Sequence, residues 1–183
     1  GNAYPHKNLE TVIEAIRRLN KNRKEKVTFV IGGSRDIFKQ RLETKIKEVG
    51  VEDCVRLLGY VPDKDLFTLY KGAVAFIYPS LSEGFGLQGL EALNSGTLLV
   101  ASNIPVFKEI YDNNALFFDP KNVDSLVNAM KKAMNMPYAG RLSNFEKANE
   151  FIKKYSWQRM AKETLEVYKE ALKKIDQKEI DEN

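Results

Sequence analysis

The segment PSLSEGFGLQGLEALNSG, residues 79–96, contains the densest group of residues that could do chemistry. Glu83 precedes and Glu91 follows a loop in which Gly84 and Gly86 permit tight turns and let a ligand approach the backbone. Ionised carboxylates only accept hydrogen bonds, so they suit the hydroxyl donors of sugars. At a rise of ~1.5 Å per residue, Glu91 lies about 7–8 Å along a helix from Gly86. The two carboxylates can therefore bind hydroxyls on opposite sides of a diphosphate held between them.

The same loop leads into a helix, predicted from about Gly86 to Asn94, whose first amides have no partner within the helix. We expect the amides of Gly86, Leu87 and Gln88 to point from this N-terminus, which favours phosphate binding. Alternatively, both glutamates are ordinary surface carboxylates, because Glu is common in helices. Their place after a predicted strand favours the ligand role, since ligands of parallel sheets bind at the carboxyl ends of strands.

The elements that position this loop follow from the hydrophobic pattern. Short apolar runs predict strands at residues 27–33, 55–61, 73–80, 97–102 and 115–119. Apolar residues at helical spacing predict intervening helices at about 9–19, 38–49, 63–70, 86–94 and 106–111, and further helices from about 123. Continuous apolar strands separated by helices indicate a parallel sheet covered on both faces. The expected fold is therefore α/β and doubly wound, with the sheet and crossover helices over about 1–136 and C-terminal helices over about 137–183.

The chain begins in a loop that feeds directly into its first predicted helix. Asn8 stands where its side chain is expected to cap the first free amides of that helix. A strand–helix–strand unit also requires a strand before the helix. We therefore expect an upstream strand, and with it a further domain, in a longer protein.

The composition excludes several classes of protein. Of 183 residues, 43% are hydrophobic and 30% are charged, which indicates a folded domain rather than a disordered chain. The 29 Lys and Arg residues exceed the 25 Asp and Glu residues by only four and lie among them, so we expect no nucleic-acid partner. The apolar runs are far shorter than the ~20 residues that span a membrane. No signal peptide is apparent, and Cys54 is the one cysteine, so we expect a cytoplasmic protein.

The pair of glutamates separated by seven residues, in EGFGLQGLEALNSG followed by VAS, resembles the retaining glycosyltransferases of the GT-B fold, family 4 type. Further matching stretches occur in the family's order: GNAYPHKNLETVIEAI, VRLLGYVPDKDLFTLYKGAVAFIYPS, ASNIPVFKEIYDNNALFFDPKNVDSL and YSWQRMAKETLEVY. The resemblance covers nearly the whole chain. It implies a Rossmann-like, donor-binding C-terminal domain of an enzyme that transfers a hexose, such as mannose or glucose, from a nucleoside diphosphate sugar.

The resemblance also implies the partners of such a domain. The acceptor is a sugar or a lipid-linked sugar, and its site lies in an N-terminal domain that this chain lacks. Peripheral contact of the full-length protein with the cytoplasmic membrane face is left open. The family generally uses no metal or other cofactor, and the sequence shows no His, Cys or carboxylate cluster with the spacing of metal ligands.

The family's residue roles can be carried to the matching positions. Glu91 would bind the ribose hydroxyls, and Glu83 would bind hydroxyls of the transferred sugar near its anomeric carbon. Lys7 would neutralise the diphosphate, so that Glu83 and Lys7 are the implied catalytic residues. Backbone amides would come from Gly84, Phe85, Gly86 and Leu87. The nucleotide base would be held by Gly59, Tyr60 and Val61. Donors aimed at the leaving diphosphate would stabilise the charge that it gathers in the transition state.

Two positions depart from the family's pattern. Many members pair the lysine with an arginine a few residues upstream, where this chain reads Gly1-Asn2-Ala3-Tyr4. His6 can substitute only in part, because an unpaired lysine is a weaker clamp than an arginine fork. Gln88 stands where proline is frequent, which is harmless early in a helix.

These departures leave other functions open. A non-catalytic module that binds nucleotide sugars is the main alternative, motivated by the missing arginine and opposed by the retained pair of glutamates. A dinucleotide-dependent oxidoreductase would need a GxGxxG fingerprint at the first strand–helix turn, and GNAYPHKN is not one.

Some single residues also have two interpretations. Gly32 and Gly33 could cradle phosphate, although a plain turn is favoured. Tyr60 is either a stacking partner for the base or an ordinary half-buried aromatic residue. Cys54 is expected to be a small core residue.

Overall fold

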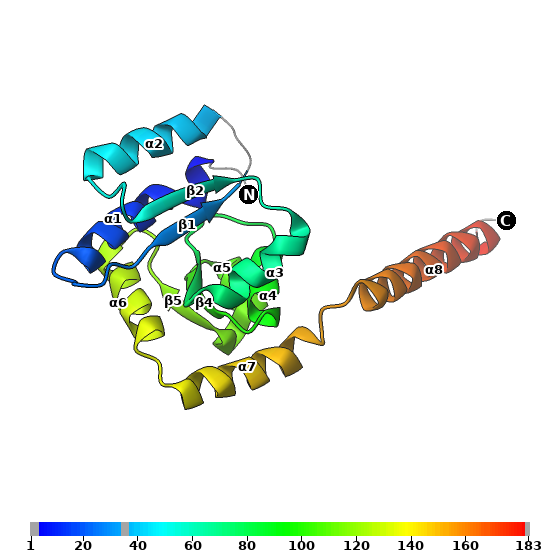
Figure 1. Cartoon of the computed structure of the whole chain (residues 1–183). Coiled ribbons are helices and arrows are strands. Elements are labelled where there is room, and N and C mark those ends of the chain that lie inside the picture. The colour runs from blue at the N-terminus through cyan, green and yellow to red at the C-terminus, as the bar shows by residue number, and fades with distance from the viewer. Residues whose placement is uncertain (1–3, 34–36, 182–183) are drawn as a thin grey trace. The chain divides into compact units, whose positions relative to one another are not determined.

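The structure, a computed structural model, describes residues 4–33 and 37–181, and it divides the chain into two compact units, 1–148 and 149–183 (Figure 1). The described part of the first unit begins η1 (Pro5–Lys7), α1 (Leu9–Asn20), β1 (Phe29–Gly32), α2 (Ile37–Val49), β2 (Val55–Gly59), α3 (Asp63–Gly72) and β3 (Ala75–Tyr78). It continues with α4 (Leu87–Asn94), β4 (Leu98–Ser102), α5 (Pro105–Tyr111), η2 (Asp112–Asn114), β5 (Ala115–Phe118) and α6 (Val123–Met134). Helix α7 (Tyr138–Ile152) crosses the boundary, and α8 (Trp157–Asp181) belongs to the second unit.

The predicted alternation of strands and helices is confirmed. Each of the five predicted strands is present, although each is shorter than its apolar run because the flanking residues belong to loops. The prediction that Gly50 ends the second helix is also confirmed, since Gly50 follows α2 with a φ of +70°. The α/β class and the parallel pairing of the strands therefore follow from the sequence pattern.

The five parallel strands of the described residues form two sheets. Among the described residues, β1 pairs in parallel only with β2, while β3, β4 and β5 form a second parallel sheet in that order. No hydrogen-bonded ladder joins β1 to β3 in this part of the chain. A cavity of about 920 Å³ is lined by residues of both β1 and β3.

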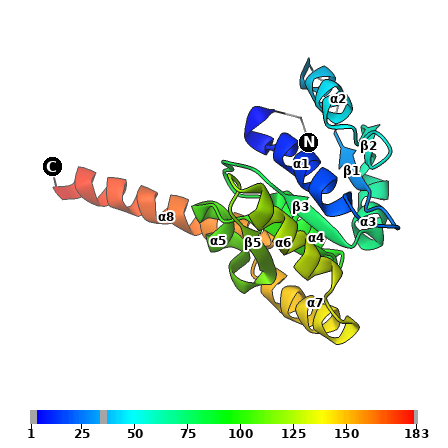
Figure 2. The same cartoon turned by 90° about the vertical axis from the view of Figure 1, so that its left-hand side faces the viewer.

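The core of the first unit is packed most tightly around β4 and α1. All five residues of β4 are buried. The inward face of α1 is fully buried through Val12, Ile13 and Ala15, and α1 packs between α2 and α6 (Figures 1 and 2). Each fully buried Val or Ile side chain contributes roughly 1.5–3 kcal/mol. Cys54 is 2% exposed within the same core, as predicted.

The expected role of Asn8 as a helix cap is wrong. Its side chain makes no capping hydrogen bond, and its backbone is left-handed with a φ of +55°. The Oδ1 atom accepts instead from the Thr11 hydroxyl at 2.6 Å. The Nδ2 atom donates to the carbonyls of Pro79 (3.1 Å) and Pro120 (2.9 Å). Asn8 therefore ties the start of α1 to the segments that follow β3 and β5.

The C-terminal helices begin within the first unit. Arg141 of α7 donates to the carbonyl of Ala133 at 2.8 Å and to that of Met136 at 3.2 Å, so it caps the end of α6. Most of α7 therefore belongs with the sheets, and the boundary between the compact units falls after Ala148. Among the residues that the structure describes, no helix is both long and apolar enough to cross a membrane.

Candidate functional site

A lysine and a glutamate that are far apart in the sequence meet at the carboxyl end of β3. Lys7 Nζ lies 2.5 Å from Glu83 Oε1, and both side chains are largely shielded from solvent. The Ser80 hydroxyl donates to the same carboxylate oxygen at 2.7 Å. The His6 carbonyl accepts from the amide of Leu81 at 2.7 Å, which holds η1 against this loop. The structure therefore brings together two residues that the sequence predicted as site residues, Lys7 and Glu83.

The electrostatics of this cluster favour a charged carboxylate. Burial by itself would raise the pKa of Glu83, but hydrogen bonds from Lys7 and Ser80 and the charge of Lys7 outweigh it and lower the pKa. The Lys7 ammonium also lies 5.7 Å from the ring centroid of Tyr78. Burial first, and then the charge of Glu83, raise the pKa of Tyr78, so its phenol stays neutral. Because an ammonium has three donors and a carboxylate about four acceptor positions, both groups retain capacity for a ligand.

The N-terminus of α4 lies in the same loop. Gly86 is its N-cap residue, with a φ of +106° and no side-chain cap. The Gly86 carbonyl accepts from the Tyr111 hydroxyl at 2.5 Å. A Cβ atom at Gly86 would come within 2.3 Å of that hydroxyl oxygen and 2.9 Å of a ring carbon of Phe107. Only glycine fits here, and the α5 aromatic residues hold the helix start in place with its first amides available to an anion.

The other predicted glycine of the loop behaves differently. Gly84 is exposed, has no positive φ, and would have open space around a Cβ atom. The backbone bends at Gly84, but neither its φ nor its surroundings require glycine there. Gly89, inside α4, is the glycine that packing requires instead, because a Cβ atom there would lie 2.3 Å from the Tyr111 hydroxyl oxygen.

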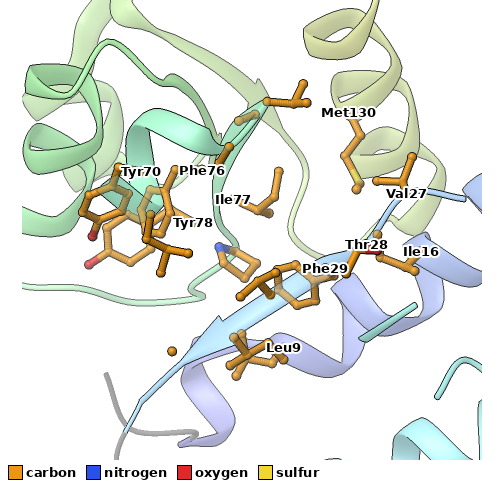
Figure 3. A pocket seen from close by; sticks show the side chains of 18 of the residues that line it. Leu9, Ile16, Val27, Thr28, Phe29, Tyr70, Phe76, Ile77, Tyr78 and Met130 are labelled. Atoms are coloured by element: carbon orange, nitrogen blue, oxygen red, sulfur yellow. The ribbon is translucent and has the colours of Figure 1, made fainter. Parts of the chain in front are cut away.

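Glu91, the second glutamate, lies on the exposed face of α4. Its Oε2 atom accepts from the Tyr70 hydroxyl at 3.3 Å. The Tyr70 ring contacts Phe76 with 5.3 Å between centroids, and Phe76 contacts Tyr78 at 5.5 Å (Figure 3). A row of aromatic rings thus joins the two acidic residues, and the pKa of Tyr78 is raised by Glu91 as well as by Glu83.

The predicted base-binding residues lie at the end of β2 and directly after it. Gly59 has a φ of +75°, and its carbonyl accepts from the amide of Gly33 at 2.8 Å. This bond continues the pairing of β1 with β2, and Gly32 is the last residue of β1. Tyr60 is 74% exposed, so the half-buried interpretation is wrong and its ring is open to a partner. Val61 is partly buried, and its methyl group would lie 3.1 Å from a Cβ atom at Gly32.

The remaining predicted residues are distributed around the loop. Phe85 and Leu87 are 39% and 49% exposed. Gln88 and Lys7 line the cavity between β1 and β3, whereas Glu83 and Glu91 do not. The exposed His6 ring stacks on Tyr4 with 5.9 Å between centroids. The Gly1–Ala3 part of the position where relatives have arginine lies outside the described residues. Within residues 4–33 and 37–181, no group of three or more His, Cys, Asp or Glu side chains is placed to hold a metal ion.

Sequence reasoning missed the residues that support the site. Ser80 and Tyr78 contact or influence Glu83, Tyr70 binds Glu91, and Tyr111 fixes Gly86. One signal was present: Tyr78 and Ser80 stand at the end of a continuous apolar strand, where ligands of parallel sheets bind. No pattern pointed to Tyr111, because its partner lies 25 residues away.

Comparison with known proteins gives independent information. The sequence profile of the family described as "Glycosyl transferases group 1" matches residues 1–158. The O-antigen chain mannosyltransferase RfbU of Salmonella typhimurium is 32% identical over 163 residues, which cover 87% of this chain and 43% of that protein. O-antigen chain mannosyltransferase B of Escherichia coli is 30% identical over 173 residues, which cover 92% of this chain and 44% of that protein.

The fold is shared with solved structures. Sucrose-phosphate synthase from Thermosynechococcus elongatus superposes with a TM-score of 0.82 at 22% identity, covering 94% of this chain and 44% of that one. This chain therefore spans less than half the length of the proteins that it matches. Because the family profile matches most of its length, the chain belongs to the glycosyl transferases group 1 family.

Proposed function

We propose that this chain binds a nucleoside diphosphate sugar, with its diphosphate on the N-terminus of α4 and beside Lys7. One observation supports this proposal most directly. Lys7, which lies in η1, forms an ion pair with Glu83, and Glu83 lies in the loop that leads into α4, whose N-terminus has no side-chain cap. A diphosphate there would accept hydrogen bonds from the first amides of α4 and from the ammonium of Lys7.

The sugar and the nucleoside would lie on either side of the diphosphate. Glu83, held in its ionised form, suits hydroxyls of the transferred sugar, with Gly84 and Phe85 contributing backbone amides. Glu91 suits the ribose hydroxyls, because it is exposed and its contact with Tyr70 is long. The base would lie over Gly59, Tyr60 and Val61, where the exposed ring of Tyr60 can stack on it.

As the leaving diphosphate separates from the sugar, it gains negative charge. Lys7 and the amides of Gly86, Leu87 and Gln88 are aimed at this charge, and they would stabilise it more strongly than they stabilise the bound donor. Glu83 fixes Lys7 through their ion pair, so it also orients the cation.

We further propose that the full-length protein is a retaining hexosyltransferase, and the names of its relatives favour a mannosyl donor. A sugar or lipid-linked acceptor would then bind to a second domain, and peripheral contact with the cytoplasmic membrane face belongs to the same proposal. We propose metal-independent binding, so that affinity for the donor is equal in EDTA and in magnesium.

Isothermal titration calorimetry with UDP, GDP and ADP, and with the corresponding nucleosides, tests donor binding. Lys7→Ala should weaken binding of the preferred diphosphate by about 10- to 100-fold, because a charge-assisted hydrogen bond is lost. Binding of the nucleoside should change little. The matched control is Lys108→Ala, which removes an exposed lysine on α5 without altering either affinity.

Two results would contradict the proposal. Equal losses for diphosphate and nucleoside would mean that Lys7 does not contact phosphate. Absence of binding by all six compounds to a folded chain would remove the donor site. Transfer of labelled sugar by the full-length protein separates the enzyme from a binding module without catalysis.

A further inference from the structure

The two glutamates of the candidate site have different kinds of partner. Glu83 accepts from the Lys7 ammonium and from the Ser80 hydroxyl. Among the described residues, Glu91 accepts a side-chain hydrogen bond only from Tyr70, whose hydroxyl lies 3.3 Å from its Oε2 atom. A phenol is a neutral donor, so this bond directs the carboxylate without cancelling its charge. Glu91 therefore keeps its negative charge for the hydroxyl donors of a ligand.

The backbone of Tyr70 is fixed near the end of α3. Its carbonyl accepts from the amide of Ala73 at 2.9 Å and from the Thr97 hydroxyl at 2.6 Å. Thr97 is 4% exposed and directly precedes β4, the strand whose residues are all buried. Tyr70 is therefore attached to the tightly packed part of the unit, although its hydroxyl contacts an exposed residue of α4.

The ring of Tyr70 is fixed as well. It packs edge to face on Phe76 of β3, with 5.3 Å between the centroids and 85° between the planes, an arrangement that aromatic pairs favour. Figure 3 shows Tyr70, Phe76 and Tyr78 in one row, with the hydroxyl oxygens of both tyrosines on the same side. Because a tyrosine side chain has only two torsions, the backbone bonds and the ring contact together determine where its hydroxyl lies.

Glu91 has little else to hold its side chain. It lies on the exposed face of α4, and a glutamate loses considerable rotamer freedom when it is fixed. A carboxylate that a donor already directs loses less of this freedom when a ligand binds. Burial first, and then the charge of Glu91, raise the pKa of Tyr70, so the phenol keeps the proton that it donates.

The bond from Tyr70 leaves most of the Glu91 carboxylate available. An ionised carboxylate has about four acceptor positions, and Tyr70 occupies one of them, on Oε2. The remaining positions are sufficient for two adjacent hydroxyls of a ribose. The bond is also longer than the ~2.7–2.8 Å that is most frequent for hydroxyl donors. Hydrogen bonds of functional sites are often long without ligand and shorten in the complex.

We propose that Tyr70 is a positioning residue, whose hydroxyl holds Glu91 in the orientation that accepts the 2′- and 3′-hydroxyls of a ribose. This inference rests on the proposed function, in which Glu91 binds the ribose. Acting through Glu91, Tyr70 makes the site select ribonucleotides over 2′-deoxyribonucleotides. The role belongs to the hydroxyl alone, because the contact of the ring with Phe76 does not require it.

Calorimetric titration of the full-length protein tests this role. The probes are UDP, GDP and ADP together with their 2′-deoxy forms. The proteins are the unmodified protein, Tyr70→Phe, Glu91→Ala and the variant that carries both substitutions. Tyr70→Phe removes the hydroxyl and keeps the ring on Phe76. The matched control is Tyr138→Phe, which removes the hydroxyl of an exposed tyrosine on α7 and should leave every affinity unchanged.

Tyr70→Phe should selectively weaken binding of the ribonucleotide. For the preferred base, we expect a loss of about 3- to 10-fold for the diphosphate with ribose and less than about twofold for its 2′-deoxy form. The ratio of the two affinities should fall accordingly. In the Glu91→Ala background, Tyr70→Phe should have almost no further effect, because the hydroxyl acts through that carboxylate.

Two results would overturn the role of Tyr70 and leave the donor site untouched. One is a Tyr70→Phe variant that discriminates between the two sugars as well as the unmodified protein does, since a purely structural role would weaken both probes equally. The other is a pair of losses that simply add in the double variant. By contrast, an unmodified protein that binds ribose and 2′-deoxyribose forms equally would overturn the assignment of Glu91 to the ribose, and this inference with it.

Discussion

The strands β1 and β4 have about the same length and belong to the same α/β unit, but their surroundings differ. β4 pairs with a strand on each side and all of its residues are buried. β1 pairs with one strand, and each of its residues retains exposure. The unit thus has a tightly packed half around β3–β4–β5 and a more open half around β1–β2.

The two parts of the candidate site are held in place in different ways. The start of α4 belongs to the packed half, where Tyr111 and Phe107 fix Gly86. Lys7 belongs to η1, which is held by the hydrogen bonds of Asn8 and by the contact between His6 and Leu81. The amides that we propose for phosphate binding are therefore fixed by packing, while Lys7 is held by a few polar contacts at the carboxyl ends of the strands.

The largest expected effect compares a glycine in each half. Gly86 and Gly50 both have positive φ, but only Gly86 has atoms within 3 Å of an added Cβ atom, and Gly50 has none within 4 Å. Gly86→Ala should lower the free energy of unfolding by about 3–4 kcal/mol, from backbone strain and overlap together. Gly50→Ala should lower it by only about 1 kcal/mol. Urea unfolding measures both, and equal losses would mean that the aromatic packing around Gly86 adds nothing.

A smaller loss of stability is expected when the ion pair between Lys7 and Glu83 is removed. The lowered pKa of Glu83 means that its carboxylate stabilises the fold above its ordinary pKa of 4.5 and loses this contribution as the pH falls further. Glu83→Gln should therefore cost about 1 kcal/mol at pH 7 and much less at pH 3. Urea unfolding of both proteins at the two pH values measures this. A difference that is independent of pH would show that ionisation of Glu83 does not contribute.

The smallest expected effect concerns Glu14 of α1, which pairs with an exposed arginine. Hydrogen bonds from Arg17 principally lower the pKa of Glu14 to about 2. Because its partners are exposed, Glu14→Gln should cost only about 0.5 kcal/mol at low salt, and less in 1 M NaCl. Stability from this carboxylate is also present above its ordinary pKa and is lost as the pH falls toward 2. A loss as large as that of Glu83→Gln would contradict the ranking of the two sites.

Local pattern predicted most of the fold. The apolar runs predicted every strand, and helical spacing predicted α1, α2 and α4, because burial imposes these periods directly on the sequence. The same pattern indicates burial but does not identify the neighbours of each strand, so the strand orders β1–β2 and β3–β4–β5 could not be predicted from it.

Less of the site could be predicted. The loop and its helix were found from residue types alone, but the contact of Lys7 with Glu83 joins positions 76 residues apart. The two loop glycines look alike in the sequence, although Gly86 is sterically required and Gly84 is not. Which glycine is required depends on Tyr111 and Phe107, and their arrival at this place is a consequence of the tertiary fold.

Amide chemical shifts during titration with UDP, GDP and ADP would test most directly whether a diphosphate binds at the start of α4. The largest changes with the preferred diphosphate should occur at Gly86, Leu87, Gln88 and Lys7, and its nucleoside should leave these amides nearly unchanged. Saturable binding with changes confined to other residues, or equal changes with the nucleoside, would contradict the account.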